Sequence, residues 1–143
     1  MSKGPLQGIR ILDFGRVLSA PYATLHLADL GADVVKVEHP DGGDDTRQFG
    51  PPFVGTLSTY FMSINRGKRS IVLDLKTETG RQRAKDLALR ADVLVENFRP
   101  GVMAKLDLGA DVLCSENPSL IYASLSGFGH QYPEKPGYDL MIQ

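Results

Sequence analysis

Segments with the pattern of buried strands alternate with helical segments along this chain, and that alternation most constrains its fold. The segments 9–14 and 33–39 have strand patterns, and a helical segment, 22–30, lies between them. Pro21 suits the first turn of this helix, and Gly31 suits its C-terminal stop. A strand–helix–strand unit of this kind implies two parallel strands joined by a right-handed crossover.

The alternation continues toward the C-terminus. We expect further strands at 70–75, 92–98 and 119–125, and helices at 79–90, 100–106 and 111–116. The sequence therefore predicts a single α/β domain with a Rossmann-like, open, mainly parallel sheet of about five strands and flanking helices. The expected core residues are Ile11, Leu12, Val35, Val37, Val72, Val93, Val95, Ile121 and Ala123. The stretch 40–66 shows no such periodicity, and an insertion this long in a compact domain is usually functional.

Composition excludes several classes of protein. The 16 basic and 17 acidic residues give a net charge of −1, so no global charge attracts nucleic acid or an anionic membrane. The lone Cys114 excludes an internal disulfide framework and fits a reducing compartment. The sequence shows neither the apolar core of a signal peptide nor an apolar run of membrane-spanning length. We therefore expect a soluble, cytoplasmic protein.

Polar groups at the ends of expected strands are the first candidates for a site. A buried-strand pattern, 92–95, leads directly into Glu96, Asn97 and Phe98. Open α/β sheets bind ligands at the carboxyl ends of their strands. The loop 15–21, between the first strand and the first helix, could offer backbone amides to an anion, although it lacks the Gly-x-Gly-x-x-Gly dinucleotide fingerprint. The alternative, that residues 15–21 form a plain connecting loop without a binding role, agrees with the sequence equally well.

A cluster of cations precedes the third strand. Arg66, Lys68 and Arg69 could neutralise a phosphate, and Lys105 follows the next strand and could converge on the same ligand. The alternative is a solvated loop, which is the usual role of a charge run. The segment 73–76, which follows the cluster, favours ligand binding.

The three histidines and one carboxylate near the C-terminus are candidate catalytic groups. His26 lies among leucines and is expected to be packed, whereas His39 could face a ligand or solvent. His130 lies in a loop rich in glycine and proline. Asp139 could be reactive, but capping a helix is the commoner use of such an aspartate. No histidines and carboxylates have metal-ligand spacing, so we predict no metal.

Eight ordered segments carry a resemblance that covers nearly the whole chain: Gly8–Asp13, Asp29–Glu38, Asn65–Ile71, Leu73–Lys76, Val95–Phe98, Asn117–Pro118, Ser126–Gly129 and Gly137–Asp139. With these segments the chain resembles the N-terminal part of family III CoA-transferases, a group that includes carnitine CoA-transferases, formyl-CoA transferases and acyl-CoA racemases. Gly42–Arg47 and Phe49–Phe53 are similar to members that act on dicarboxylic acids. The resemblance implies that 1–143 is a CoA-binding domain from the N-terminal portion of a longer fold.

The resemblance also implies a set of CoA-binding residues. These are Leu18, Ser19, His39, Leu73, Leu75, Lys76, Asn97, Phe98 and Lys105. His39 and Lys105 stand where relatives often carry arginine, so each keeps a donor but loses the forked geometry. The resemblance implies coenzyme A or acyl-CoA as a substrate and no permanently bound cofactor.

The implied activity is transfer of CoA from an acyl-CoA to a carboxylic acid through an aspartyl-CoA intermediate. The resemblance places the nucleophilic aspartate beyond Gln143, so Asp139 is not its counterpart and this chain alone is expected to be inactive. Tyr138 stands where the racemase branch carries histidine, which argues against racemisation. A non-catalytic module that binds CoA or nucleotides, or that merely assembles with a partner, is the alternative, as from a truncated or split gene.

The C-terminal residues also suggest association. Leu140, Met141 and Ile142 would lack their usual covering, and exposed apolar patches mark association surfaces. We expect a homo-oligomer or a complex with a C-terminal partner chain.

Overall fold

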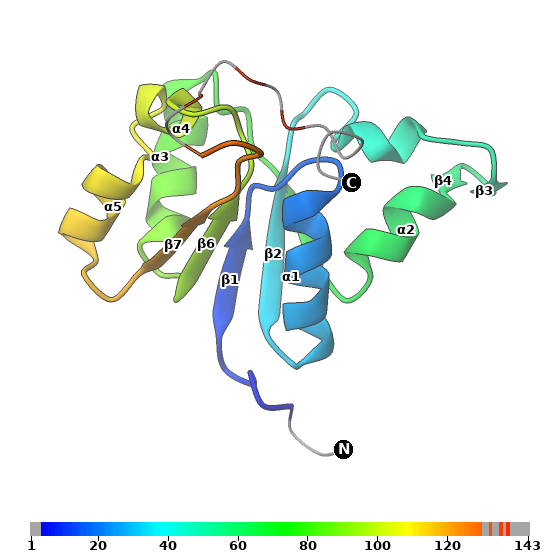
Figure 1. The fold of residues 1–143 in the computed structure, drawn as a ribbon, viewed down its shortest axis with the longest axis horizontal. Helices are drawn as coiled ribbons and strands as arrows, with labels where there is room; N and C mark the ends of the chain where they lie inside the picture. The colour runs from blue at the N-terminus through cyan, green and yellow to red at the C-terminus, as the bar shows by residue number, and fades with distance from the viewer. Residues whose placement is uncertain (1–3, 130–131, 133–134, 136, 138–143) are drawn as a thin grey trace.

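The computed structural model describes residues 4–129, 132, 135 and 137, and a five-stranded sheet lies at its centre (Figure 1). Its strands are β1 (Arg10–Asp13), β2 (Asp33–Glu38), β5 (Arg69–Val72), β6 (Val93–Glu96) and β7 (Ile121–Ser124). Every neighbouring pair is parallel, and the order is β5-β2-β1-β6-β7. This is the doubly wound order, in which the chain builds outward from β1 in one direction and then in the other. The predicted α/β fold with a parallel, Rossmann-like sheet is confirmed.

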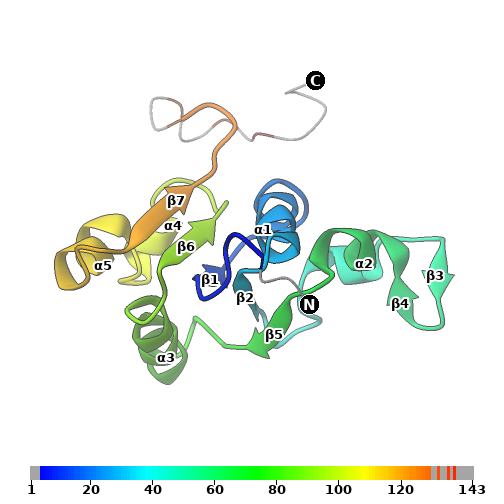
Figure 2. The same cartoon turned by 90° about the horizontal axis from the view of Figure 1, so that it is seen from below.

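Helices cover both faces of the sheet (Figure 2). They are α1 (Ser19–Asp29), α3 (Glu78–Ala88), α4 (Val102–Lys105) and α5 (Ala110–Glu116). No helix in the described part of the chain is both long and apolar enough to cross a membrane.

Successive residues of the strands face opposite sides, so the sheet has two cores. On one side, Leu12 and Leu94 belong to a buried cluster with Ala84 of α3 and Leu113 of α5. On the other side, a smaller buried cluster joins residues of β1, β2 and β6 to Ala20 of α1. The apolar runs in the sequence therefore form strands that are covered on both faces, as parallel sheets require.

The core prediction was right at the centre of the sheet and wrong at its edges. Four of the expected residues are buried: Ile11, Leu12, Val37 and Val95. Three others are partly buried against the two clusters: Val35, Val93 and Ala123. Val72 and Ile121 are instead 61% and 63% exposed. They lie on β5 and β7, which are the two edge strands.

The stretch 40–66, which showed no periodicity, is built from short elements. They are the 3-10 helix η1 (Asp45–Gln48), strands β3 (Phe53–Val54) and β4 (Leu57–Ser58), and helix α2 (Thr59–Asn65). Ser58 begins α2 by accepting a hydrogen bond from the Phe61 amide, at 3.2 Å. Helix α2 lies beside α1, and the β3–β4 hairpin forms the outer end of the molecule (Figures 1 and 2).

Some residues singled out in the sequence lie outside the described residues. They are His130, Tyr138, Asp139, Leu140, Met141 and Ile142.

Candidate functional site

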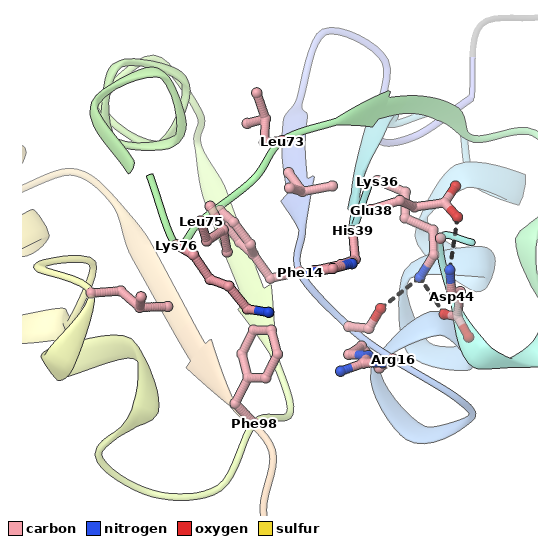
Figure 3. Close-up of a pocket in the computed structure, with 14 residues that line it drawn as sticks. Phe14, Arg16, Lys36, Glu38, His39, Asp44, Leu73, Leu75, Lys76 and Phe98 are labelled. Carbon is pink, nitrogen blue, oxygen red and sulfur yellow. Dashed lines mark hydrogen bonds and ion pairs between the residues drawn. The ribbon is translucent and has the colours of Figure 1, made fainter. Parts of the chain in front are cut away.

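A pocket of about 180 Å³ opens at the carboxyl ends of the strands (Figure 3). Its lining comes from the end of β2, from the segments that follow β1, β2, β5 and β6, and from the end of α4. It consists of Phe14, Gly15, Arg16, Lys36, Val37, Glu38, His39, Gly43, Asp44, Leu73, Leu75, Lys76, Phe98 and Leu106. The direction of strand order reverses between β1 and β6. A doubly wound sheet binds its ligands at this switch point.

The pocket has apolar walls and cationic side chains at its opening. The apolar lining consists of Phe14, Val37, Leu73, Leu75, Phe98 and Leu106. Figure 3 shows the Lys76 ammonium group beside the ring of Phe98, with Arg16 and His39 across from it. Lys76 and Arg16 are exposed, and no described carboxylate pairs with Lys76. Such a pocket suits a ligand that combines a flat, poorly hydrated group with an anionic one.

A buried ion pair lies behind the pocket. The Lys36 ammonium group lies 2.8 Å from Asp44 Oδ2 and donates to the Gly15 carbonyl at 2.5 Å. Both side chains are almost fully buried. Burial alone would raise the pKa of Asp44, but the charge of Lys36 and hydrogen bonds from Lys36 and Thr46 hold it below its ordinary value. The pair ties the segment before η1 to the loop that follows β1.

Glu38 anchors the same segment from the end of β2. Its carboxylate accepts two hydrogen bonds from Arg47, each 2.6 Å long, and others from Ser70 Oγ and the Asp44 amide. Burial opposes ionisation of Glu38, yet these bonds lower its pKa to about 2. Gly43, with φ of 75°, passes so close that an added Cβ would collide with the Glu38 carboxylate. Glycine is therefore required here for both conformation and space.

Another buried charge, Asp13, ends β1. Its Oδ2 accepts from Lys68 Nζ at 3.0 Å and from Thr24 Oγ1 at 2.6 Å. Lys68 also donates to the Pro21 carbonyl and to Asn65 Oδ1. Burial lowers the pKa of the Lys68 ammonium group, against the opposing effect of Asp13. Lys68 is therefore held inside the fold.

The prediction that the cations at 66–69 converge on a phosphate was wrong. Lys68 is buried, Arg66 pairs with Asp29 at 2.5 Å, and Arg69 pairs with Asp33 at 2.6 Å. None of the three lines the pocket. Carboxylates distant in sequence neutralise them, and a local charge pattern cannot reveal such partners.

Asn97 connects the end of β6 to the loop that follows β1. Its Oδ1 accepts from the Arg16 amide, and its Nδ2 donates to the Arg16 carbonyl, each at 2.8 Å. Nδ2 also donates to Ser19 Oγ at 2.9 Å. Val17, the next residue in the loop, has φ of 62°, which is strained for a β-branched side chain. Asn97 thus fixes the backbone on one side of the pocket.

The structure brings most of the predicted CoA-binding residues together. The pocket lining includes His39, Leu73, Leu75, Lys76 and Phe98. The others surround it: Leu18 and Ser19 begin α1, Asn97 holds the neighbouring loop, and Lys105 is exposed on α4 next to the lining residue Leu106.

Sequence reasoning missed several lining residues. Lys36 and Asp44 carry charges that are buried in the fold, and no pattern in the sequence indicates that they pair. Phe14 is the last residue of the expected strand 9–14 and Arg16 comes shortly after it, so their position at its carboxyl end was the available signal.

The structure also bears on histidine and on metal chemistry. His26 was expected to be packed, but it is exposed on α1 and its ring meets the edge of Tyr22. Within residues 4–129, 132, 135 and 137, no group of three or more metal-ligating side chains is gathered.

Known proteins with similar sequences agree with the resemblance seen in the sequence. Residues 6–143 match CoA-transferase family III. Succinyl-CoA:glutarate CoA-transferase of Mus musculus is 49% identical over 140 residues, which are 96% of this chain and 32% of that protein. Acetyl-CoA:oxalate CoA-transferase of Acetobacter aceti is 50% identical over 143 residues, covering 99% of this chain and 36% of the relative.

Solved structures are also similar to this chain. The chain is similar to a CAIB/BAIF family protein from Brucella suis, with 47% identity, a TM-score of 0.94, and coverage of 99% of this chain and 39% of that one. A putative betaketoacyl-ACP reductase with 15% identity and a TM-score of 0.55 shares the fold alone. The chain thus spans about a third of the length of the curated relatives described above.

Proposed function

Because the chain belongs to CoA-transferase family III, we propose that it forms the CoA-binding part of an enzyme that transfers CoA between an acyl-CoA and a carboxylic acid. The observation that carries this proposal is the pocket at the carboxyl ends of the strands, with its apolar walls and cationic opening. The adenosine and phosphates of CoA present the same combination of a flat ring system and negative charge.

In the proposed binding mode, the adenine lies against Leu73, Leu75 and Phe98. Lys76 and Lys105 supply positive charge to the phosphates, with Lys76 at the pocket and Lys105 beside it. The start of α1, at Leu18 and Ser19, and the side chains of His39 and Asn97 complete the contacts. The backbone amides of a helix N-terminus favour a nearby anion.

The proposed reaction begins when an aspartate carboxylate attacks the acyl-CoA thioester. The attack forms a mixed anhydride and releases CoA thiolate, which then attacks the aspartyl carbonyl, gives an aspartyl-CoA thioester and expels the donor's carboxylate. The acceptor carboxylate attacks this thioester, which forms a second mixed anhydride and releases CoA thiolate again. The thiolate then attacks the acceptor's carbonyl, which gives the new acyl-CoA and restores the aspartate carboxylate. We place this nucleophile outside the described residues. Relatives named for glutarate and for oxalate point to a dicarboxylic acid as the acceptor.

Calorimetric titration of CoA into the 143-residue chain tests the proposed site. Replacing Lys76 or Lys105 with alanine should weaken binding by about 0.5–2 kcal/mol, the scale of one charge-assisted hydrogen bond at a partly wet site. Affinity should also fall as salt rises, because exposed charge pairs are screened. Arg83→Ala is the matched control, since Arg83 is exposed on α3 and does not line the pocket.

Two results would contradict the proposed site. One is an absence of heat at millimolar CoA. The other is tight binding that is unchanged when both lysines are replaced together.

The alternative is a module that binds CoA or nucleotides without catalysis. Acyl exchange should be measured with this chain alone and with the remaining portion of a relative added. We expect activity only in the second case. Robust activity of this chain alone would mean that the nucleophile has been misplaced, and continued inactivity of the mixture despite CoA binding would favour the module.

A further inference from the structure

Arg16 is a pocket-lining cation whose backbone is fixed and whose side chain is only lightly held. Both its amide and its carbonyl are bonded to the Asn97 side chain, at 2.8 Å each. Its side chain is 46% exposed. The base of the side chain is therefore rigid, whereas the guanidinium group lies in contact with solvent at the pocket.

The partner of that guanidinium group is an exposed carboxylate. One nitrogen of Arg16, Nη2, lies 3.0 Å from Asp45 Oδ1 and 2.9 Å from Oδ2, and Asp45 is 55% exposed. Asp45 begins η1, and its neighbour Asp44 anchors that segment inside the fold. The Arg16–Asp45 bridge therefore joins two fixed segments, one after β1 and one after β2.

The other pocket-lining cations differ from Arg16. Lys36 is buried and neutralised by Asp44, so its charge is committed to the fold. Lys76 is exposed and has no described carboxylate partner, so its charge is always available. Arg16 is intermediate, because its charge becomes available only when the bridge to Asp45 opens.

We propose that the Arg16–Asp45 bridge is an exchangeable contact and that Arg16 leaves Asp45 to bind a phosphate group of the nucleotide in the pocket. This inference rests on the proposed nucleotide site. A phosphate offers more negative charge and more acceptor oxygens than one carboxylate, and arginine binds it through paired hydrogen bonds. An exposed ion pair is weakly held, so its exchange is accessible. Asp45 thereby lowers the affinity of the pocket for phosphate esters.

The test measures the affinity of the 143-residue chain for CoA, 3′-dephospho-CoA and adenosine. Asp45→Asn should raise the affinity for CoA by about threefold to tenfold, because Arg16 is freed and a repulsive charge is removed. Arg16→Met should lower it by about tenfold. In the Arg16→Met background, Asp45→Asn should lose most of its effect. Adenosine, which lacks phosphate, should respond to neither change.

The two phosphorylated ligands locate the contact. An effect of Asp45→Asn on CoA that is absent for dephospho-CoA assigns Arg16 to the 3′-phosphate, and an equal effect on both assigns it to the diphosphate. Asp33→Asn is the matched control, since it opens a similar exposed bridge, to Arg69, at the opposite end of β2. Its effect on affinity should be negligible.

The outcomes separate this inference from the proposed function. If the unaltered chain binds CoA but Asp45→Asn leaves affinity unchanged or lowers it, the exchange is wrong and the site stands. An equal response of adenosine would also overturn the exchange. If the unaltered chain and all variants bind none of the three ligands, both proposals fail.

Discussion

Several charged side chains are almost fully buried where β1 and β2 end, and each has a partner within the fold. Asp13 is bonded to Lys68, and Lys36 is paired with Asp44. A buried charge is costly to remove from water, so these pairs are tolerated only because both members are present. Removal of one member of such a pair should therefore destabilise the pocket region.

Replacing Lys36 with methionine should lower the free energy of unfolding by about 3–5 kcal/mol, because Asp44 is left buried without a countercharge. Urea denaturation measures the effect. Adding Asp44→Asn to this variant removes the orphaned charge while retaining an oxygen acceptor, and should recover part of the loss. A loss below about 1 kcal/mol in the single variant would show that the pair is not essential to the fold.

Glu38 should make stability depend on acid pH. Its pKa of about 2 in the folded chain lies below the ordinary value of 4.5. The stabilisation is therefore present above pH 4.5 and is lost as the pH falls toward 2. The pKa shift corresponds to at most about 3 kcal/mol. Glu38→Gln should reduce stability at pH 7 and should flatten its decline between pH 5 and pH 3.

Urea unfolding at a series of pH values measures this difference. Glu116→Gln is the control, because Glu116 is more exposed and forms only a peripheral bridge to Lys85. Parallel pH profiles for the unaltered chain and Glu38→Gln would contradict the assignment.

At the scale of elements, the alternation of strand and helix patterns was sufficient to predict the sheet. What the sequence did not reveal was the position of each strand within it. Val72 and Ile121 have the residue type of core strands, but β5 and β7 are edge strands. Strand order depends on how crossovers pack in three dimensions, and apolar runs of similar composition do not encode it individually.

The candidate site was also predictable only in part. Residues directly after strands, such as Lys76 and Phe98, line the pocket as the topology requires. Segment 40–66 was not predictable, because buried contacts between Glu38 and Arg47 and between Lys36 and Asp44 hold part of it in place. In a sequence, such residues look like solvated charges.

Helix α3 provides a prediction for a single element. Thr77 precedes the helix, and its side chain accepts a hydrogen bond from the Gly80 amide at 3.0 Å. Thr77→Ala should therefore cost about 1 kcal/mol of unfolding free energy. Thr79→Ala, within the exposed first turn, is the control and should be neutral or slightly stabilising. Equal effects of the two substitutions would mean that the cap contributes nothing.

At the scale of the whole molecule, the described residues include exposed apolar side chains on the β3–β4 hairpin and on both edge strands of the sheet. Val54 and Leu57, on the β3–β4 hairpin, are 60% and 49% exposed. The edge strands expose Val72 and Ile121. Edge strands and apolar patches both favour association with another chain.

We therefore expect the chain to associate as its concentration rises. Light scattering should give a mass above the 15.6 kDa of one chain at high concentration. If the chains associate through β7, Ile121→Lys should reduce the association. If they associate through the β3–β4 hairpin, Val54→Lys should reduce it. A constant mass of 15.6 kDa over a wide concentration range would contradict the expectation.

The hydrogen bonds between Asn97 and Arg16 also have a consequence for the order of folding. They join residues 81 positions apart, so they form only after β6 has docked beside β1. A partly folded chain in which only β1, β2 and β5 are paired lacks the wall that Phe98 provides. A nucleotide bound at the proposed site would then select the completed sheet, and at a hundred times its dissociation constant it would stabilise that state by about 2.7 kcal/mol. In the proposed binding mode, CoA would therefore also act as a ligand that favours completion of the sheet.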